Sequence, residues 1–441
     1  MRRAIGLISP INTVRALQLF QVMRFCGILF GGILLSRSPL SMREIGIFES
    51  ILFISGAFSF FWVGGLMNGL SILHREQENP EKSSFFFNAA VVLYILNALL
   101  LIVMLLFQRF VETLLPPEAV DYFQLLLLFI FLNNPAFLIE QMMMLQQRPR
   151  GLLIYGWVQM CGYILCTALP VFMGYGLNYS LYALIVFALL KNFYLLSEVR
   201  KSSRIAIDLN FISTLLIYTA PLIVSMLISG SAEYIDGFLV STHFGSDAFA
   251  IFRYGAKELP LAVLLSGALS NAMTASFSSK GLNQDTLGEL KKESLRLMHL
   301  LFPVTIVLLL SSTWFYPLVF RSEFVASAPI FNTYLLLLIS RAVFPQTLVM
   351  ALGKTGVIFK IALLEISVNT VCSYFLMLQL GIIGIALGTL VAFFTEKLAL
   401  AVYLHKIQGI AAYEYIPWKT WLMYGFLLLS VYFVHYFSAH I

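Results

Sequence analysis

The sequence predicts an all-helical polytopic membrane protein, and three observations carry this prediction. Of its 441 residues, 60% are hydrophobic and only 11% are charged, whereas soluble domains carry about 25% charged residues. A mean hydropathy of +0.88 leaves too little polar surface to cover a water-facing globule. The apolar residues also form runs of about 20, the length that crosses the hydrocarbon as a helix. Runs such as 125–132 do not alternate as the strands of a membrane β-barrel do.

Thirteen apolar segments are candidate spans, because charged residues or Gly- and Pro-containing breaks separate them. No connecting segment exceeds roughly 15 residues, which leaves no room for a soluble catalytic domain. Since nucleotide-binding, zinc-hydrolase and serine-elbow motifs are also missing from the sequence, we expect no enzyme, cofactor or metal site. The spans lie at residues 11–35, 43–72, 84–109, 120–146, 151–174, 176–198, 210–241, 246–278, 292–319, 326–352, 356–379, 382–405 and 418–438.

Basic residues give the orientation of the chain rather than a nucleic-acid site, because they are scattered among apolar runs and form no basic face. Alternate loops hold 16 and 4 Lys and Arg residues. Cytoplasmic loops carry such an excess, so we expect a cytoplasmic N-terminus. The rich set is Arg2, Arg3, Arg75, Lys82, Arg148, Arg150, Arg200, Lys201, Arg204, Lys280, Lys291, Lys292, Arg296, Lys354, Lys406 and Lys419, and the poor set is Arg37, Arg43, Arg109 and Arg321.

A short internal match predicts two related lobes. Residues 32–36 (GILLS) parallel residues 237–241 (GFLVS), 205 positions later, and a Gly-Ile-Phe or Ala-Ile-Phe triplet follows each copy. Six spans separate the copies, so both have the same orientation and the repeat is parallel. The predicted six-span lobes cover residues 1–204 and 205–408, and residues 409–441 form an extension with the thirteenth span.

Arg24 is the most deeply placed basic residue of the first span. It lies 13 residues after the start of the span at residue 11, roughly 20 Å at 1.5 Å per residue. A charge at mid-bilayer costs about 2.5 to 3.5 kcal/mol on insertion scales, so it should face a cavity or a partner. The span contains no acidic partner, which leaves either a polar cavity or hydrogen bonds to carbonyl groups. Glu140 and Lys191 lie near predicted span ends and are interpreted as interfacial.

Spans 7 and 8 are expected to form a hairpin around residues 241–246, which places their charges at matching levels. Asp236 then faces Arg253, and Glu233 faces Lys257. Arg253 and Lys257 are four residues apart and so share one helix face. These residues predict either two buried salt bridges or a cationic wall whose acidic partners exchange with an anionic substrate.

The second lobe holds further charges within its spans. Arg341 lies midway through span 10, Glu365 lies in span 11, and Glu396 lies at a comparable depth in span 12. Acids inside a membrane often bind cations or relay protons, and simple pairing with Lys or Arg of neighbouring spans is the alternative. The candidates for ion coupling are Asp236, Glu233, Glu365 and Glu396.

Three segments of the sequence resemble bacterial polysaccharide exporters. Residues 250–279 (AIFRYGAKELPLAVLLSGALSNAMTASFSS), preceded by Tyr234-Ile235-Asp236 and Gly245, are similar to spans 7 and 8 of that group. Residues 43–58 (REIGIFESILFISGAF) and 63–76 (VGGLMNGLSILHRE) resemble its span 2 and the exit from it. The group is the polysaccharide-transporter branch of the multidrug/oligosaccharidyl-lipid/polysaccharide exporter superfamily, which includes the O-antigen flippases. Its motifs are diffuse, and Gly237 follows Asp236 where the family often has Arg.

The resemblance implies two six-helix lobes around a central cavity that opens to each side in turn. It also implies a polyprenyl-diphosphate-linked oligosaccharide as substrate, flipped outward across the bacterial inner membrane for surface polysaccharide synthesis, with a polymerase and glycosyltransferases as partners. A coupling proton or cation is possible. Basic side chains suit a diphosphate, and the candidates are Arg24, Arg253, Lys257 and Arg341. The alternative is a cation-coupled multidrug or small-molecule exporter of the same superfamily, because acids such as Glu233, Asp236 and Glu365 are also present.

Overall fold

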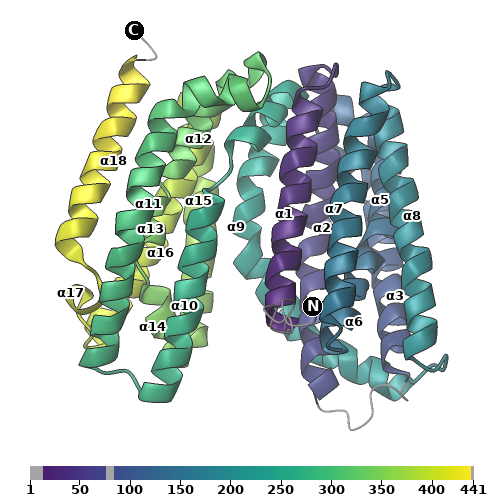
Figure 1. Ribbon diagram of the computed structural model, residues 1–441, viewed down its shortest axis with the longest axis horizontal. Helices are drawn as coiled ribbons and strands as arrows, with labels where there is room; N and C mark the ends of the chain where they lie inside the picture. The colour runs from purple at the N-terminus through teal and green to yellow at the C-terminus, as the bar shows by residue number, and fades with distance from the viewer. Residues whose placement is uncertain (1–12, 76–83, 439–441) are drawn as a thin grey trace, which may run out of the picture. The chain divides into compact units, whose positions relative to one another are not determined.

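The computed structural model describes residues 13–75 and 84–438, and nearly all of them are helical (Figure 1). Within these residues the chain forms no β-strand, and twelve helices are long and apolar enough to cross a membrane. The predicted all-helical, multi-span class is therefore confirmed. The chain divides into two compact units. The first runs to Gly230 and includes Phe244–Asp247, and the second comprises Ser231–His243 and the chain from Ala248 onward.

The first unit contains six candidate spans before α9. Helix α1 packs along α7, and α7 packs along α8 (Figure 1). Glycine makes the first of these contacts close, since a Cβ at Gly31 would lie 2.8 Å from the ring of Tyr163. Small residues allow such approach between membrane helices. The elements are α1 (Thr13–Ser36), α2 (Met42–Arg75), α3 (Phe85–Leu106), α4 (Gln108–Thr113), η2 (Pro117–Tyr122), α5 (Phe123–Asn133), η3 (Asn134–Ala136), α6 (Phe137–Leu145), α7 (Pro149–Phe172) and α8 (Gly176–Ser202).

Helix α9 (Leu209–Gly255) carries the chain from the first unit into the second, and Gly245 interrupts it with a non-helical φ of 77°. This interruption falls at the hairpin predicted for residues 241–246. In the second unit, α15 packs along α16, and α11 packs along α18. The elements are α10 (Pro260–Lys280), α11 (Gln284–Val319), η4 (Ser322–Ser327), α12 (Ala328–Leu335), α13 (Leu338–Arg341), α14 (Pro345–Ala351), α15 (Thr355–Leu380), α16 (Ile382–Gln408), α17 (Ala412–Tyr415) and α18 (Trp418–Ser438).

The order and bounds of the elements repeat along the chain. The 3-10 helices η2 and η4 begin 205 residues apart, as do α5 and α12, and the ends of α2 and α10 show the same separation. The turns before α8 and α16 also correspond, because Gly176 and Gly381, again 205 apart, both have positive φ, 74° and 61°. The structure thus repeats at the spacing of the short sequence match. The predicted lobe boundary at residue 204 lies in the non-helical segment 203–208, whereas the compact units divide within α9.

Helix α18 covers the predicted thirteenth span, 418–438. Among the residues that the structure describes, it is not one of the twelve helices that qualify as spans by length and hydropathy. Its crossing of the membrane therefore stays a prediction.

Span 4 of the first unit is broken where η3 separates α5 from α6, at Pro135. Proline removes a backbone donor and disturbs the preceding turn, and carbonyl groups freed within a membrane need other partners. The Asn97 side chain donates to the Phe131 carbonyl oxygen at 2.8 Å, and the Asn192 side chain donates to that of Leu132. Buried amides from two neighbouring helices thus satisfy the break.

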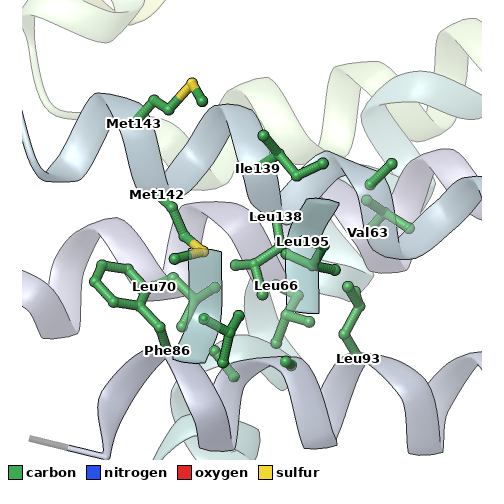
Figure 2. Packing of buried hydrophobic residues seen from close by; sticks show 14 of the residues in the cluster. Val63, Leu66, Leu70, Phe86, Leu93, Leu138, Ile139, Met142, Met143 and Leu195 are labelled. Carbon is green, nitrogen blue, oxygen red and sulfur yellow. The ribbon is translucent and has the colours of Figure 1, made fainter. Parts of the chain in front are cut away.

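An apolar core lies between α2, α3, α6 and α8 of the first unit (Figure 2). Leu66 of α2, Leu93 of α3, Leu138 of α6 and Leu195 of α8 are each 0% exposed. Because lipid tails are as apolar as these side chains, van der Waals packing rather than exclusion of water holds such helices together. This core packs against α6 and so supports the second half of the broken span 4.

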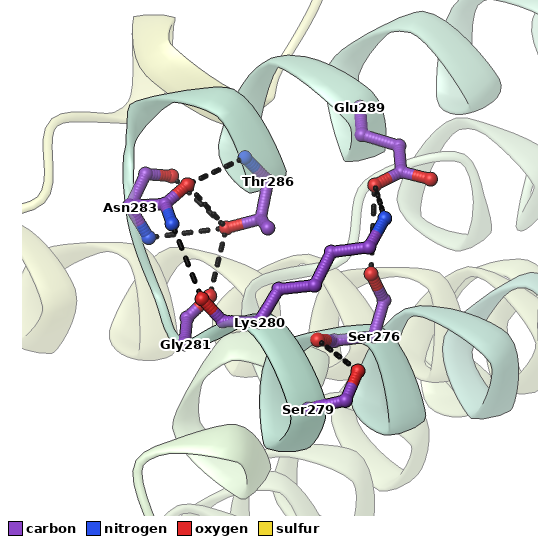
Figure 3. A network of polar contacts seen from close by, with 7 residues as sticks. All are labelled: Ser276, Ser279, Lys280, Gly281, Asn283, Thr286 and Glu289. Atoms are coloured by element: carbon purple, nitrogen blue, oxygen red, sulfur yellow. Dashed lines mark hydrogen bonds and ion pairs between the residues drawn. The ribbon is translucent and has the colours of Figure 1, made fainter.

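The turn between α10 and α11 is closed by a polar network (Figure 3). Asn283 Oδ1 accepts from the Thr286 backbone N–H at 2.9 Å, and Thr286 Oγ1 accepts from the Asn283 N–H at 3.0 Å. This reciprocal capping satisfies donors at the start of α11. Lys280 Nζ lies 3.2 Å from Glu289 across the turn. The turn separates the two helices where the sequence predicts the end of span 8.

Candidate functional site

The carboxyl group of Asp236 on α9 is buried, and it accepts hydrogen bonds from hydroxyl groups of two other helices. Its Oδ2 accepts a hydrogen bond from the Tyr334 hydroxyl of α12 at 2.5 Å and one from the Thr389 hydroxyl of α16. The Asn369 side chain of α15 donates to the Thr389 hydroxyl oxygen at 3.5 Å and so lies beside this group. The residue is 4% exposed. From the sequence, Asp236 was expected to face Arg253 at the same level of the hairpin. In the structure its hydrogen bonds come from α12 and α16 instead.

The other oxygen of this carboxyl group, Oδ1, has no hydrogen-bond partner among the described residues. A buried polar atom without a partner carries an uncompensated desolvation cost. A proton or a small cation at Oδ1 removes that cost, and the side-chain oxygens of Thr389 and Tyr334 add hard ligands nearby. One carboxylate among neutral oxygens suits a proton or a monovalent cation, and within the described residues no group of three or more His, Cys, Asp or Glu side chains fits a metal ion.

Arg341 forms a two-pronged ion pair with Glu258. Its Nε donates to Oε2 at 2.9 Å, and its Nη2 donates to Oε1 at 2.7 Å. The guanidinium carbon also lies 4.9 Å from the centre of the Phe393 ring. A fork of this kind fixes direction as well as distance. Arg341, a predicted substrate ligand, is therefore engaged within its own unit.

Three predicted coupling acids surround this pair. Glu233 of α9 interacts electrostatically with Glu258 and Arg341, and Glu365 of α15 interacts with Glu396 and Arg341. Glu396 Oε2 itself lies 2.7 Å from Lys397 Nζ. The structure thus gathers these carboxylates around Arg341, while Asp236 has separate hydrogen-bond partners.

Arg253 and Lys257 lie at and just beyond the end of α9. Lys257 Nζ is 4.9 Å from the centre of the Tyr254 ring, and Arg253 interacts electrostatically with Tyr234. The chain is non-helical from Ala256 to Leu259 before α10 begins at Pro260. This break interrupts predicted span 8, and it carries Lys257 and Glu258.

Arg24 of α1 pairs with an acid from a different helix of the first unit. Its Nη1 lies 3.4 Å from Glu140 Oε1 on α6, and its guanidinium carbon lies 5.8 Å from the centre of the Phe20 ring. The Arg24 side chain is 37% exposed. Glu140 thus supplies the partner that the first span lacks.

Lys191 of α8 completes this cluster of the first unit. It interacts electrostatically with Glu140, and its Nζ donates to Asn133 Oδ1 at 2.8 Å, at the break in span 4. Lys191 and Glu140, interpreted from the sequence as interfacial, therefore belong with Arg24.

Sequence reasoning missed Glu258 and the hydroxyl partners of Asp236. Pro260 was an available signal for the first, because the residues before a proline leave the helical conformation, and a charge beside such a break needs a partner. The residues around Asp236, namely Tyr334, Asn369 and Thr389, carried no local signal, since Thr and Asn inside membrane spans commonly bond to their own helix or a neighbour.

These features define a class: a multi-pass helical membrane protein with ion pairs within its spans and at their breaks. The family model described as "Polysaccharide biosynthesis protein" matches residues 35–329, more than half of the chain. The chain belongs to this family, and the predicted membership of the polysaccharide transporter branch is confirmed.

Solved structures show the same fold. The structure described as "Lipid II flippase MurJ, inward closed conformation" matches with a TM-score of 0.69 and 18% identity, over 96% of this chain and 93% of that one. An inward-facing multidrug resistance MATE family transporter of the MOP superfamily matches with a TM-score of 0.66 and 14% identity, over 91% and 100%. A MOP superfamily transporter from Pyrococcus furiosus matches with a TM-score of 0.55 and 13% identity, over 89% and 95%. No curated protein sequence matches the chain significantly.

Proposed function

We propose that this protein is a flippase that moves a polyprenyl-diphosphate-linked oligosaccharide from the cytoplasmic to the outer leaflet of the bacterial inner membrane. The lipid-linked sugar serves a surface polysaccharide such as O-antigen, made with glycosyltransferases and a polymerase. Transport proceeds by alternating access, and the N-terminus lies in the cytoplasm. The family match and the flippase among the structural neighbours support this choice.

Arg24 is the observation that carries the proposal. A guanidinium has five N–H donors, and the ion pair with Glu140 at 3.4 Å engages Nη1 alone. With 37% of its side chain exposed inside a membrane span, Arg24 has donors to offer a diphosphate, which binds such forks well. Arg253 and Lys257 of the second unit are the other basic residues that the proposal assigns to the diphosphate. Arg341 is a weaker candidate, because Glu258 occupies its fork.

The membrane potential favours export of an anionic head group. Moving one charge through the full potential is worth about 2.3 kcal/mol per 100 mV, so an uncompensated head of two negative charges gains roughly 4 to 5 kcal/mol when it moves outward. We assign inward movement of a coupling proton or cation to Asp236, because its Oδ1 is buried without a partner among the described residues. Glu233, Glu365 and Glu396 are secondary candidates.

Flipping of a fluorescent polyprenyl-diphosphate sugar in proteoliposomes tests the proposal. Wild type, Arg24→Ala and Lys257→Ala are compared at matched protein levels, with Arg109→Ala, an exposed arginine of α4, as the control. We expect wild type and the control to flip the lipid and both other variants to lose at least about tenfold in rate, as removal of charge-assisted contacts predicts. If liposomes with the wild-type protein flip the lipid no faster than empty liposomes under an imposed potential, the proposed substrate is wrong.

The acids around Arg341 favour a second candidate function, a cation-coupled multidrug or small-molecule exporter. Glu233, Glu365 and Glu396 would then attract a cationic substrate or coupling ion. Efflux of a cationic dye separates the two functions. Efflux that persists in Arg253→Ala and Lys257→Ala, together with no flipping of the lipid, supports the exporter.

A further inference from the structure

The segment Ala256–Leu259 is a non-helical break between α9 and α10, within the region that the sequence predicts as span 8. Pro260 accounts for it, because the residue before a proline is held in an extended conformation, and Leu259 has ψ of 111°. Irregular backbone at membrane depth persists where protein supports it or where it lines a cavity. Such breaks often mark binding sites in transporters.

The chain is anchored immediately before this break. The Tyr316 hydroxyl donates to the Tyr254 carbonyl oxygen at 2.9 Å, and the Ser327 hydroxyl donates to that of Ile251 at 2.8 Å. A Cβ at Gly255 would lie only 2.6 Å from the Ser327 carbonyl oxygen. The end of α9 is therefore fixed against α11 and η4.

Glu258 anchors the break from its other side, through the fork of Arg341 at 2.7 and 2.9 Å. Arg341 is itself held in place, although it is the last residue of α13, where its span is broken before α14. The Trp421 indole N–H donates to the Ile339 carbonyl oxygen at 2.8 Å, and the Ser294 hydroxyl donates to that of Ala342 at 2.9 Å. The backbone on both sides of Arg341 is thus held by hydrogen bonds from other helices, and Arg341 in turn holds Glu258.

We propose that Arg341 is a positioning residue: its paired contact with Glu258 fixes the Ala256–Leu259 break and so orients Arg253 and Lys257 for the anionic head group. This inference rests on the proposed function for the role of those two basic residues, and it removes Arg341 from the substrate ligands. Lys257 lies between the two anchors, next to Glu258 in sequence, and Arg253 lies within the anchored turn. Breaking the ion pair between Arg341 and Glu258 would make the side chains of Arg253 and Lys257 more mobile and would leave both of their charges in place.

Mobility of the break tests the positioning role without any substrate. A nitroxide label is placed at Ala256→Cys in a variant whose four native cysteines are serine, and spectra are recorded in detergent for the wild-type pair, Glu258→Gln and Arg341→Lys. We expect a sharper, more mobile spectrum in both variants. A label at Gly267→Cys, where a side chain meets open space, controls for general loosening and should not change. If both variants remain folded and their spectra are as broad as that of the protein with the intact Arg341–Glu258 pair, the proposal is wrong.

Flipping kinetics provide a second measurement, which would not change if Arg341 had a purely structural role. Arg341→Gln is expected to raise the half-saturating lipid concentration on the order of tenfold to hundredfold, the cost of small misplacements at a binding site, with a smaller change in maximal rate. Adding Glu258→Gln should recover part of this loss, since the double variant leaves no half-buried carboxylate without its cation. A double variant that recovers none of the loss seen in Arg341→Gln means that Arg341 binds the substrate itself. If wild type flips no lipid, the proposed function fails, and the label mobility still decides the role of the fork.

Discussion

The guanidinium of Arg24 and the carboxylate of Glu140 approach within 3.4 Å although 116 residues separate them in the chain. In the proposed function, Glu140 competes with the diphosphate for Arg24. Glu140 also interacts electrostatically with a second cation, Lys191. Glu140 thus sets how strongly the basic side chain attracts an anion.

Glu140→Gln is expected to lower the half-saturating concentration of lipid-linked sugar several-fold. Glutamine keeps the shape of the side chain and removes the competing charge, so Arg24 is left with the substrate as its anionic partner. Concentration dependence of flipping in proteoliposomes provides the measurement, and Asp121→Asn, an exposed acid of the same span, is the control. A Glu140→Gln protein that binds the lipid as poorly as Arg24→Ala would show that the ion pair orients Arg24 rather than competing for it.

Asp236→Asn is expected to uncouple transport from an ion gradient. The amide oxygen still accepts from Tyr334 and Thr389, the two hydrogen bonds of Oδ2, but it neither takes up a proton nor attracts a cation. Wild-type flipping should quicken when a sodium or proton gradient is imposed across proteoliposomes, and the variant should flip at the same rate with and without it.

Asp247→Asn provides the matched control, because Asp247 is an exposed acid of the same helix α9. Its gradient dependence should equal that of wild type. If Asp236→Asn keeps its full response to both gradients, the coupling ion binds elsewhere, and the acids around Arg341 become the next variants to examine.

The sequence predicted the helical class, the first twelve spans and the residues of interest well, because hydropathy and the cost of a buried charge act on each segment by itself. It predicted their partners poorly. Arg341 and Glu258 are 83 residues apart, and Asp236 and Thr389 are 153 apart. Such pairs depend on which helix faces are turned together, and no local pattern determines that.

The breaks in the spans could be predicted from the sequence only in part. Pro135 and Pro260 are visible in the sequence and coincide with the breaks in spans 4 and 8, so a proline within an apolar run was a usable signal. Their support was not visible, because Asn97 and Asn192 reach the break in span 4, and Arg341 reaches the break in span 8, from other helices.

Trp421→Phe is expected to destabilise the second unit. The indole N–H of Trp421 donates to the Ile339 carbonyl oxygen at 2.8 Å, and phenylalanine retains the aromatic packing without the donor. Hydrogen bonds between membrane helices are worth about 0.6 to 1.7 kcal/mol in double-mutant cycles, so a modest fall in the unfolding temperature should follow. Helical circular dichroism during heating in detergent measures it. Trp418→Phe makes the same ring change at the stacked neighbour of Trp421, which is 47% exposed. Equal loss in both variants would assign the effect to stacking instead.

Gly388→Ala is expected to damage both stability and ion coupling. A Cβ at Gly388 on α16 would lie 2.3 Å from Ser373 Oγ and 2.4 Å from its Cα, so α15 and α16 must separate. Overpacking of this kind costs about 1 to 3 kcal/mol. Ser373 donates to Asn369 Oδ1 at 2.9 Å, and Thr389 follows Gly388 directly. The added methyl group therefore moves Thr389, which binds Asp236, and Asn369, which donates to Thr389.

Two measurements on Gly388→Ala check this chain of contacts. Its unfolding temperature in detergent should fall, and its flipping should respond less to an imposed gradient, as in Asp236→Asn. Gly267→Ala serves as the control, because nothing lies within 4 Å of the added atom and alanine favours a helix by about 1 kcal/mol over glycine. A Gly388→Ala protein that is less stable but keeps the wild-type gradient response would separate the packing of α15 and α16 from the environment of Asp236, and would place ion binding away from this group of side chains.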